Sequence, residues 1–83
     1  MPSYEKLIRK IINNPKDRPV REMERIFRRE GFGRAKRTRG SHQFYTNGVI
    51  TISIVVHDKK VKRGYVERII ELLNLREKYG ETS

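Results

Sequence analysis

The chain has 83 residues, carries 20 Lys and Arg side chains against 10 Asp and Glu, and contains no cysteine. This length suits one small domain, and the lack of cysteine excludes a disulfide framework and a zinc–thiolate site. The lack of cysteine also fits a cytoplasmic protein. We see no stretch that is apolar enough for a signal peptide or a membrane span. The formal net charge of +10 indicates a polyanionic partner, nucleic acid above all.

The positive charge is concentrated in the middle of the chain. Residues 31–64 carry eight basic side chains and one acidic, whereas residues 65–83 carry three basic and four acidic. Both histidines of the chain, His42 and His57, fall within the basic part. We therefore expect the middle third of the chain to contain the binding surface.

A first helix is predicted over residues 3–13. Ser3 is a suitable N-cap, and the Asn14-Pro15 pair stops the helix. The apolar residues follow the spacing of one helical face, namely Tyr4, Leu7, Ile8, Ile11 and Ile12. This face should pack against the rest of the domain.

A second helix is predicted to open at Pro19, because proline suits the first helical turn, where its missing N–H has no partner. Its apolar face consists of Val20, Met23, Ile26 and Phe27. Gly31 should end this helix in the left-handed conformation, with Phe32 folding back onto Phe27 or Ile26.

Three strands are predicted next. Residues 34–38 are a weak candidate that is polar on both faces and so suits a sheet edge, whereas residues 41–46 and 49–56 are strong candidates. The Asn47-Gly48 pair between them predicts a two-residue turn, because both central residues of a type I′ turn need positive φ. Residues 57–63 are predicted to be a polar, basic loop.

A last helix is predicted from Gly64 or Tyr65, and the tail from about Tyr79 to residue 83 should fray. The apolar face of this helix comprises Val66, Ile69, Ile70 and Leu73, widened by Leu72. The order helix, helix, strand, strand, strand, helix predicts an α+β fold in two layers, with a three-stranded antiparallel sheet and the helices on one face. We expect residues 1–83 to form a single domain.

The predicted turn also sets the register between its two strands. Tyr45 would lie opposite Ile50, and His42 opposite Ser53, since opposed residues share a face of the sheet. The alternate isoleucines of the second strand must face the core, so their partners face the core as well. His42 and Phe44 then lie on the other face, which no helix remains to cover.

His42 therefore has two interpretations. An exposed histidine takes and gives protons near neutral pH, and its neutral ring is what a general base needs. Arg37 and Arg39 precede it in a cationic setting, which favours a reactive group. The alternative is a surface histidine without a role, and the residues alone leave both open. His57 fits a strand-end residue better than a catalytic one.

Other chemistries fit these residues poorly. With two histidines and no cysteine we expect no metal and no other cofactor. The Gly31-x-Gly33 sequence follows a predicted helix rather than a strand, so it is not a nucleotide-binding loop. Ser41 and His42 point to opposite faces as strand neighbours, so they do not form a nucleophile–base pair.

A set of motifs between residues 20 and 75 resembles the HicA toxins of bacterial and archaeal toxin–antitoxin systems. The motifs are Gly31-Phe32, the sequence RTRGSH of residues 37–42, a hairpin, a strand that ends at His57, and the sequence KKVKRG of residues 59–64 before an amphipathic helix. The helix at residues 3–13 precedes this HicA-like core of residues 20–75 and looks like the addition of a longer variant.

The resemblance implies a double-stranded-RNA-binding-like fold, endoribonuclease activity on messenger RNA, and a HicB-type antitoxin that covers the active surface. It also implies that His42 is the catalytic group. Cleavage of RNA by its own 2′-OH needs a base that removes the hydroxyl proton, and we expect His42 to be this base, with no metal ion. We expect Arg37 and Arg39 to clamp the phosphate and Phe44 to stack a base. The full set of expected RNA-binding residues is Arg37, Arg39, Gly40, Ser41, Phe44, Lys59, Lys60, Lys62 and Arg63.

Two other functions remain open from the residues. One is a non-catalytic nucleic-acid-binding module of the same fold, which includes a toxin that has lost its activity. The other is an interaction protein whose basic face meets an acidic partner. A role at an anionic membrane surface is weakest, because a domain this small needs its apolar helix faces to cover the sheet.

Overall fold

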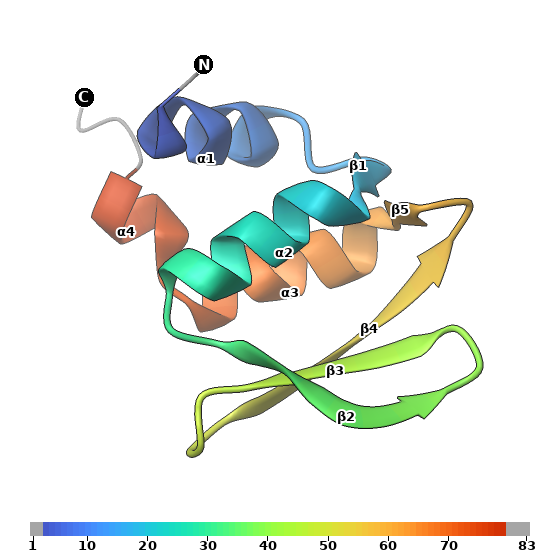
Figure 1. Cartoon of the computed structure of the whole chain (residues 1–83). Coiled ribbons are helices and arrows are strands. Elements are labelled where there is room, and N and C mark those ends of the chain that lie inside the picture. The colour runs from blue at the N-terminus through green and yellow to red at the C-terminus, as the bar shows by residue number, and fades with distance from the viewer. Residues whose placement is uncertain (1–2, 80–83) are drawn as a thin grey trace.

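The computed structural model describes residues 3–79, apart from the side chains of residues 36–39. Figure 1 shows how its helices and strands are arranged. The helices are α1 (Tyr4–Asn13), α2 (Val20–Arg29), α3 (Arg63–Leu72) and α4 (Leu75–Tyr79). The strands are β1 (Arg18–Pro19), β2 (Gly33–Arg39), β3 (His42–Thr46), β4 (Thr51–His57) and β5 (Lys60–Val61). The predicted fraying after Tyr79 concerns residues outside the described range.

The predicted α+β fold with an antiparallel sheet is confirmed, but the sheet has five strands rather than three. Its strand order is β1-β5-β4-β3-β2, with every neighbouring pair antiparallel. The weakly predicted strand is β2, which is an edge strand as expected. The two additional strands are β1 and β5, each only two residues long, which is too short for apolar alternation to reveal.

The predicted loop over residues 57–63 was wrong for a local reason. Asp58 and Lys59 both have positive φ, at 51° and 62°, so they form a two-residue turn that pairs His57 with Lys60. Such turns are usually marked by Asn-Gly or Asp-Gly, and Asp-Lys carries no such signal. The turn is fastened to the start of α2, because Val20 donates its N–H to the Lys59 carbonyl at 2.8 Å.

The predicted C-terminus of α2 is confirmed in detail. Gly31 has a φ of 87°, in the left-handed region. Phe32 donates its N–H to the Phe27 carbonyl at 2.7 Å, and Gly31 donates to Arg28 at 3.3 Å, the hydrogen-bond pair of a Schellman motif. The rings of Phe27 and Phe32 lie 5.9 Å apart. This reversal directs the chain from α2 into β2.

The core lies between the sheet and the helices α2 and α3. Tyr45, Ile52 and Ile54 are its buried residues from β3 and β4, and the Tyr45 ring stacks on that of Phe27 at 4.2 Å. The helices contribute Met23, Ile26, Phe27, Val66, Ile69 and Ile70. Figure 1 shows α1 on the far side of α2 and α3 from β2, β3 and β4, with α4 beside the ends of α2 and α3, so the helices form more than the single layer predicted.

The turn between β3 and β4 is shifted by one residue from the prediction. Gly48 and Val49 are its central residues, since Asn47 donates its N–H to the Ile50 carbonyl and Thr46 pairs with Thr51. The Asn47 carboxamide oxygen accepts from the N–H groups of Val49 and Ile50, at 2.9 and 2.8 Å, which makes asparagine a flank rather than a centre of the turn.

The one-residue shift of the turn changes the β4 partner of every β3 residue by two positions, so each side chain stays on the face that was predicted for it. His42 lies opposite Val55 instead of Ser53, yet an even shift leaves each side chain on its side of the sheet. The residue that moves out of the core is Ile50, which is 43% exposed. Leu72 was also expected on the apolar face of α3 and is instead 45% exposed, at the end of that helix.

Candidate nucleic-acid interface on the uncovered sheet face

A tight hairpin positions the histidine of the RTRGSH sequence. Arg39 and His42 are direct partners at the ends of β2 and β3, so Gly40 and Ser41 form a two-residue turn. Gly40 has a φ of 56°, a conformation that glycine adopts without steric cost. Ser41 lies in the turn and not in the strand, where it was predicted, and its carbonyl accepts the Val56 N–H at 3.1 Å.

His42 lies on the face of the sheet that turns away from the helices. Its cross-strand partner is Val55, whereas Tyr45, Ile52 and Ile54 point to the helix side of β3 and β4 and belong to the core. His42 is exposed and Phe44 is half-buried. Within the described residues, Figure 1 shows no helix on this side of β2, β3 and β4. The predicted exposure of His42 is confirmed, whereas its catalytic role stays a prediction.

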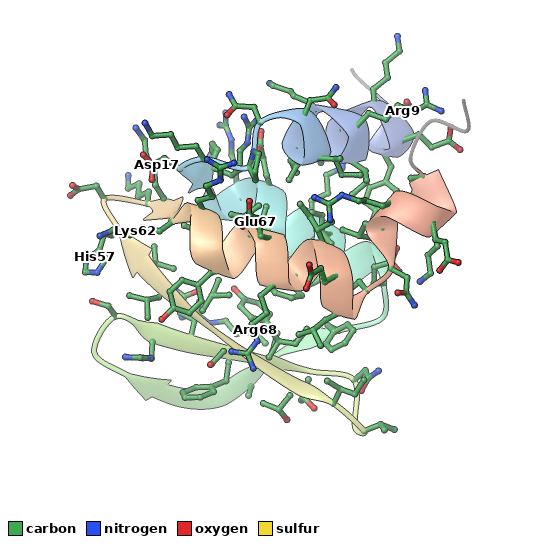
Figure 2. All side chains as sticks on the ribbon, turned by 180° about the vertical axis from the view of Figure 1, so that it is seen from behind. Arg9, Asp17, His57, Lys62, Glu67 and Arg68 are labelled. Carbon is green, nitrogen blue, oxygen red and sulfur yellow. The ribbon has the colours of Figure 1, made fainter. Side chains whose placement is uncertain are left out.

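The second histidine shares this face. His57 lies two residues beyond Val55 on β4, so the two histidines are diagonal neighbours across adjacent strands. Diagonal neighbours have Cα atoms roughly 7–8 Å apart, within reach of long side chains. Figure 2 shows His57 at the end of β4, projecting out of the molecule. The arrangement allows one group to lie between two imidazole rings.

Positive side chains surround the outer end of β4. Lys60 is the direct partner of His57, and Lys59 lies in the turn between them. Both lysines are exposed, as is Lys62, which caps α3. The expected role of this cluster in binding remains a prediction, but the tight turn brings Lys60 closer to His57 than a loop would have done.

The three arginines of the predicted site differ from its lysines and histidines in what the structure shows of their side chains. The side chains of Arg37 and Arg39 lie outside the described part of the structure, so only their backbone positions on β2 are known. Arg63 donates to the Glu67 carboxylate at 3.0 Å, an exposed ion pair one helical turn apart. Such exposed pairs contribute little stability.

Sequence reasoning did not identify Arg21 or Arg68. Arg21 opens onto a hollow of about 280 Å³ beside the β4–β5 turn, together with Pro19, Val20, Asp58, Lys59 and Lys60. Figure 2 shows Arg68 reaching from α3 toward the sheet, and it lines a shallow hollow with Gly64 and Tyr65. Neither arginine belongs to a motif, and only the packing of α2 against the β4–β5 turn brings Arg21 near Lys59 and Lys60.

The described residues contain no cluster of three or more His, Cys, Asp or Glu side chains that could hold a metal ion. The same part of the chain contains no helix with the length and apolarity needed to span a membrane.

The fold and the exposed histidine describe a small basic α+β domain with a polar sheet face open to a ligand. The family model of the HicA toxin of bacterial toxin–antitoxin systems matches residues 20–75. The chain therefore belongs to the HicA toxin family, with α1 outside the matched region. Neither the curated proteins nor the solved structures include a significant match to this chain.

Proposed function

We propose that this protein is an endoribonuclease that cleaves messenger RNA on the uncovered sheet face, without a metal ion, and that a HicB-type antitoxin covers this face. The observation that carries the proposal is the position of His42, exposed beside the Gly40-Ser41 turn on a face that no described helix covers. Membership of the HicA family supports the toxin role. The core order α2, β2, β3, β4, α3 supports a double-stranded-RNA-binding-like topology.

His42 acts as the general base in this proposal. It takes the proton of the ribose 2′-OH, and the oxygen attacks the adjacent phosphorus. The bond from phosphorus to the 5′-oxygen then breaks, which leaves a 2′,3′-cyclic phosphate on one product and a 5′-hydroxyl on the other. The nucleophile comes from the RNA itself, so the protein supplies only proton transfer and charge stabilisation.

The departing 5′-oxygen needs a proton, and His57 is our candidate for the donor. It lies diagonally across the strand pair from His42 on the same face, and Lys60 lies directly opposite it. A base and an acid on two sides of one phosphate are the arrangement that an in-line displacement uses. Water or His42 itself would be the donor if His57 is not.

The cations around these histidines hold the RNA. Arg37 and Arg39 follow β2 toward the turn, and arginine is suited to two-pronged phosphate contacts. On the other side of His57, the phosphate backbone of the RNA contacts Lys59, Lys60 and Lys62. Arg63 adds a further contact when its ion pair with Glu67 opens. The small residues Gly40 and Ser41 let the phosphate backbone of the RNA approach the turn closely. Phe44 provides an aromatic ring on which a base can stack.

The deciding experiment is cleavage of a labelled single-stranded RNA by the purified chain and by His42→Ala, with a chelator present and the product ends identified. We expect the chain to produce cyclic phosphate ends and His42→Ala to produce none while it still binds RNA. Binding lost together with cleavage, in a variant that keeps the circular dichroism of the parent, would remove the catalytic role.

The second candidate function is nucleic-acid binding without catalysis. The half-buried Phe44 on an open sheet face whose β4 strand leads to exposed lysines favours it, because such platforms bind single strands without cutting them. This candidate predicts that both proteins in the experiment above bind RNA and that neither cleaves it. A localisation in the cytoplasm, where messenger RNA is translated, goes with either candidate.

A further inference from the structure

We propose that the groove between α1 and α2 is a second binding site for the phosphodiester backbone of RNA, outside the uncovered sheet face. The groove measures about 440 Å³ and is lined by Lys6, Leu7, Lys10, Arg21, Glu22 and Arg25. The proposal rests on RNA being the ligand of the protein, as the proposed function has it. It concerns α1, which lies outside the residues that match the HicA family.

The charge of the groove is positive because its one carboxylate is already neutralised. Glu22 accepts two hydrogen bonds from Arg18, from Nε at 2.8 Å and from the second terminal nitrogen at 2.9 Å. Both side chains are nearly buried, at 13% and 10% exposed, so the pair is fixed within the fold. A bidentate pair of this kind leaves no free carboxylate to repel an anion.

The four remaining charged residues of the groove have no such partner. Lys6, Lys10 and Arg21 are exposed and Arg25 is half-buried, and none of the four forms a salt bridge with a described residue. Four cations that line one groove repel one another, and this repulsion destabilises the unbound protein. An anionic ligand relieves the repulsion when it binds. The groove is thus poised to bind negative charge.

The spacing of these cations suits a repeating anion. Lys6 and Lys10 are four residues apart on α1, and Arg21 and Arg25 are four residues apart on α2. Four residues correspond to about 6 Å along a helix axis. Each helix therefore presents two cations at a separation comparable to that of successive phosphates in a nucleic-acid strand.

The groove continues toward the β4–β5 turn. Arg21 lines both this groove and the hollow that contains Lys59 and Lys60. The hydrogen bond from Val20 to the Lys59 carbonyl holds the start of α2 against that turn. One RNA strand can follow the cations from Lys59 and Lys60 through Arg21 to the two lysines of α1, with Asp58 as the one carboxylate that lines the hollow on this path.

An acidic protein segment is the competing occupant, and the lining of the groove disfavours it. Protein interfaces usually have an apolar centre with a polar rim. Leu7 is the one apolar side chain in the lining, and it is 7% exposed. A nucleic-acid backbone needs cations and little apolar surface, so it fits the groove better.

The test compares two RNA lengths. A 20-nucleotide single strand spans about 68 Å even when stacked at about 3.4 Å per nucleotide, which exceeds the longest dimension of the molecule, 41 Å. A tetranucleotide covers about 14 Å at the same rise and cannot occupy the sheet face and the groove together. Affinities are measured by fluorescence anisotropy on full-length His42→Ala protein, so that the RNA stays intact.

The groove variant is Lys6→Gln with Lys10→Gln, two exposed positions where the fold tolerates the change. A lysine that contacts phosphate in a single strand contributes about fivefold in affinity at about 0.1 M salt. We therefore expect the 20-mer to bind about 25-fold more weakly to the double variant. The ratio of the 20-mer affinity to the tetranucleotide affinity should fall by a similar factor.

The matched control for a single lost charge is Arg76→Gln on α4, compared with Lys10→Gln. Arg76 is exposed and lies among Glu71, Asn74 and Glu77, away from the groove. The proposal is overturned if Arg76→Gln weakens 20-mer binding as much as Lys10→Gln, because the loss is then a general charge effect. It is also overturned if the double variant binds the 20-mer normally and loses affinity for poly-L-glutamate instead.

This test is independent of the catalytic proposal. Cleavage of the tetranucleotide by the chain with His42 intact reports on the sheet face, whereas anisotropy with the 20-mer reports on the groove. Absence of cleavage with length-dependent binding would remove the ribonuclease and keep the groove. Cleavage of the tetranucleotide without length-dependent binding would keep the ribonuclease and remove the groove as a binding site.

Discussion

Tyr4, at the start of α1, donates its hydroxyl to the Glu30 carboxylate at the end of α2, at 3.0 Å. Tyr79 donates to the same oxygen at 3.1 Å, and Lys78 donates to the other oxygen at 2.8 Å. The Glu30 side chain is 8% exposed, and the rings of Tyr4 and Tyr79 meet edge to face at 5.2 Å. One carboxylate thus joins both terminal helices, α1 and α4, to α2.

The first prediction concerns the stability that this carboxylate provides. Burial raises the pKa of Glu30, but hydrogen bonds from Lys78, Tyr4 and Tyr79 outweigh burial and hold that pKa below its usual value. Glu30→Gln should lower the free energy of unfolding by about 2 kcal/mol at neutral pH, because it removes charge-assisted hydrogen bonds. Urea unfolding measures the loss, with Glu71→Gln, an exposed position, as the control.

The pH dependence of this loss has a definite sign. A carboxyl whose pKa is lower in the folded state contributes fully above its unfolded pKa, and the contribution disappears as pH falls through the folded pKa. The difference between the chain and Glu30→Gln should therefore shrink as the pH falls below the usual pKa of a glutamate and through the lower pKa of folded Glu30. A difference that stays constant across this range would mean that the charge of Glu30 does not stabilise the fold.

The second prediction concerns the turn before His42. Gly40 has positive φ, and a methyl group at this position would meet no atom within 4 Å. Gly40→Ala therefore introduces backbone strain alone and should destabilise the fold by about 1 kcal/mol. Gly33→Ala is the matched control, since Gly33 has equal space and no positive φ. Equal melting temperatures of Gly40→Ala and Gly33→Ala would show that a side chain at position 40 does not strain the turn.

The third prediction tests His57 as the proton donor to the leaving oxygen. His57→Ala should slow cleavage of ordinary RNA by about 10²–10⁴-fold, the usual contribution of a general acid. A substrate with sulfur in place of the 5′-oxygen has a leaving group that needs no proton. We expect His57→Ala to cleave this substrate at nearly the rate of the parent, while His42→Ala cleaves neither. Slow cleavage of both substrates by His57→Ala would assign the residue to binding or to structure.

The fourth prediction separates stability from binding at one position. Lys59 has positive φ, which costs a side-chain-bearing residue roughly 1–2 kcal/mol and glycine nothing. Lys59→Gly should raise the free energy of unfolding by about 0.5–1 kcal/mol, because the added flexibility of the unfolded chain offsets part of the gain. The same change should weaken RNA binding by about fivefold at about 0.1 M salt.

The control for this prediction is Asn74→Gly. Asn74 also has positive φ, at 52°, in the junction between α3 and α4. Asparagine tolerates this conformation better than lysine does, so Asn74→Gly should change the free energy of unfolding less than Lys59→Gly. The Asn74→Gly variant should bind RNA like the parent. If both variants bind RNA equally well, Lys59 does not contact the strand.

The sequence alone determined the local elements and the face on which His42 lies. Helical spacing of apolar residues located α1, α2 and α3, and the Gly31-Phe32 pair identified the Schellman motif. Alternation in β4 assigned the isoleucines to the core, and this assignment survived an error in the turn because the register moved by an even number of residues. These features depend on residues near one another in the chain, so a short window contains their cause.

Only the tertiary structure decided the features that join distant segments. β1 exists because Arg18 pairs with Val61, and the groove exists because α1 packs beside α2 with Lys6 and Arg25 on its walls. Glu30 gains its three donors from residues 26 to 49 positions away. Apolar periodicity states which side of an element is buried but not which element covers it, and such pairings depend on the packing of the whole chain.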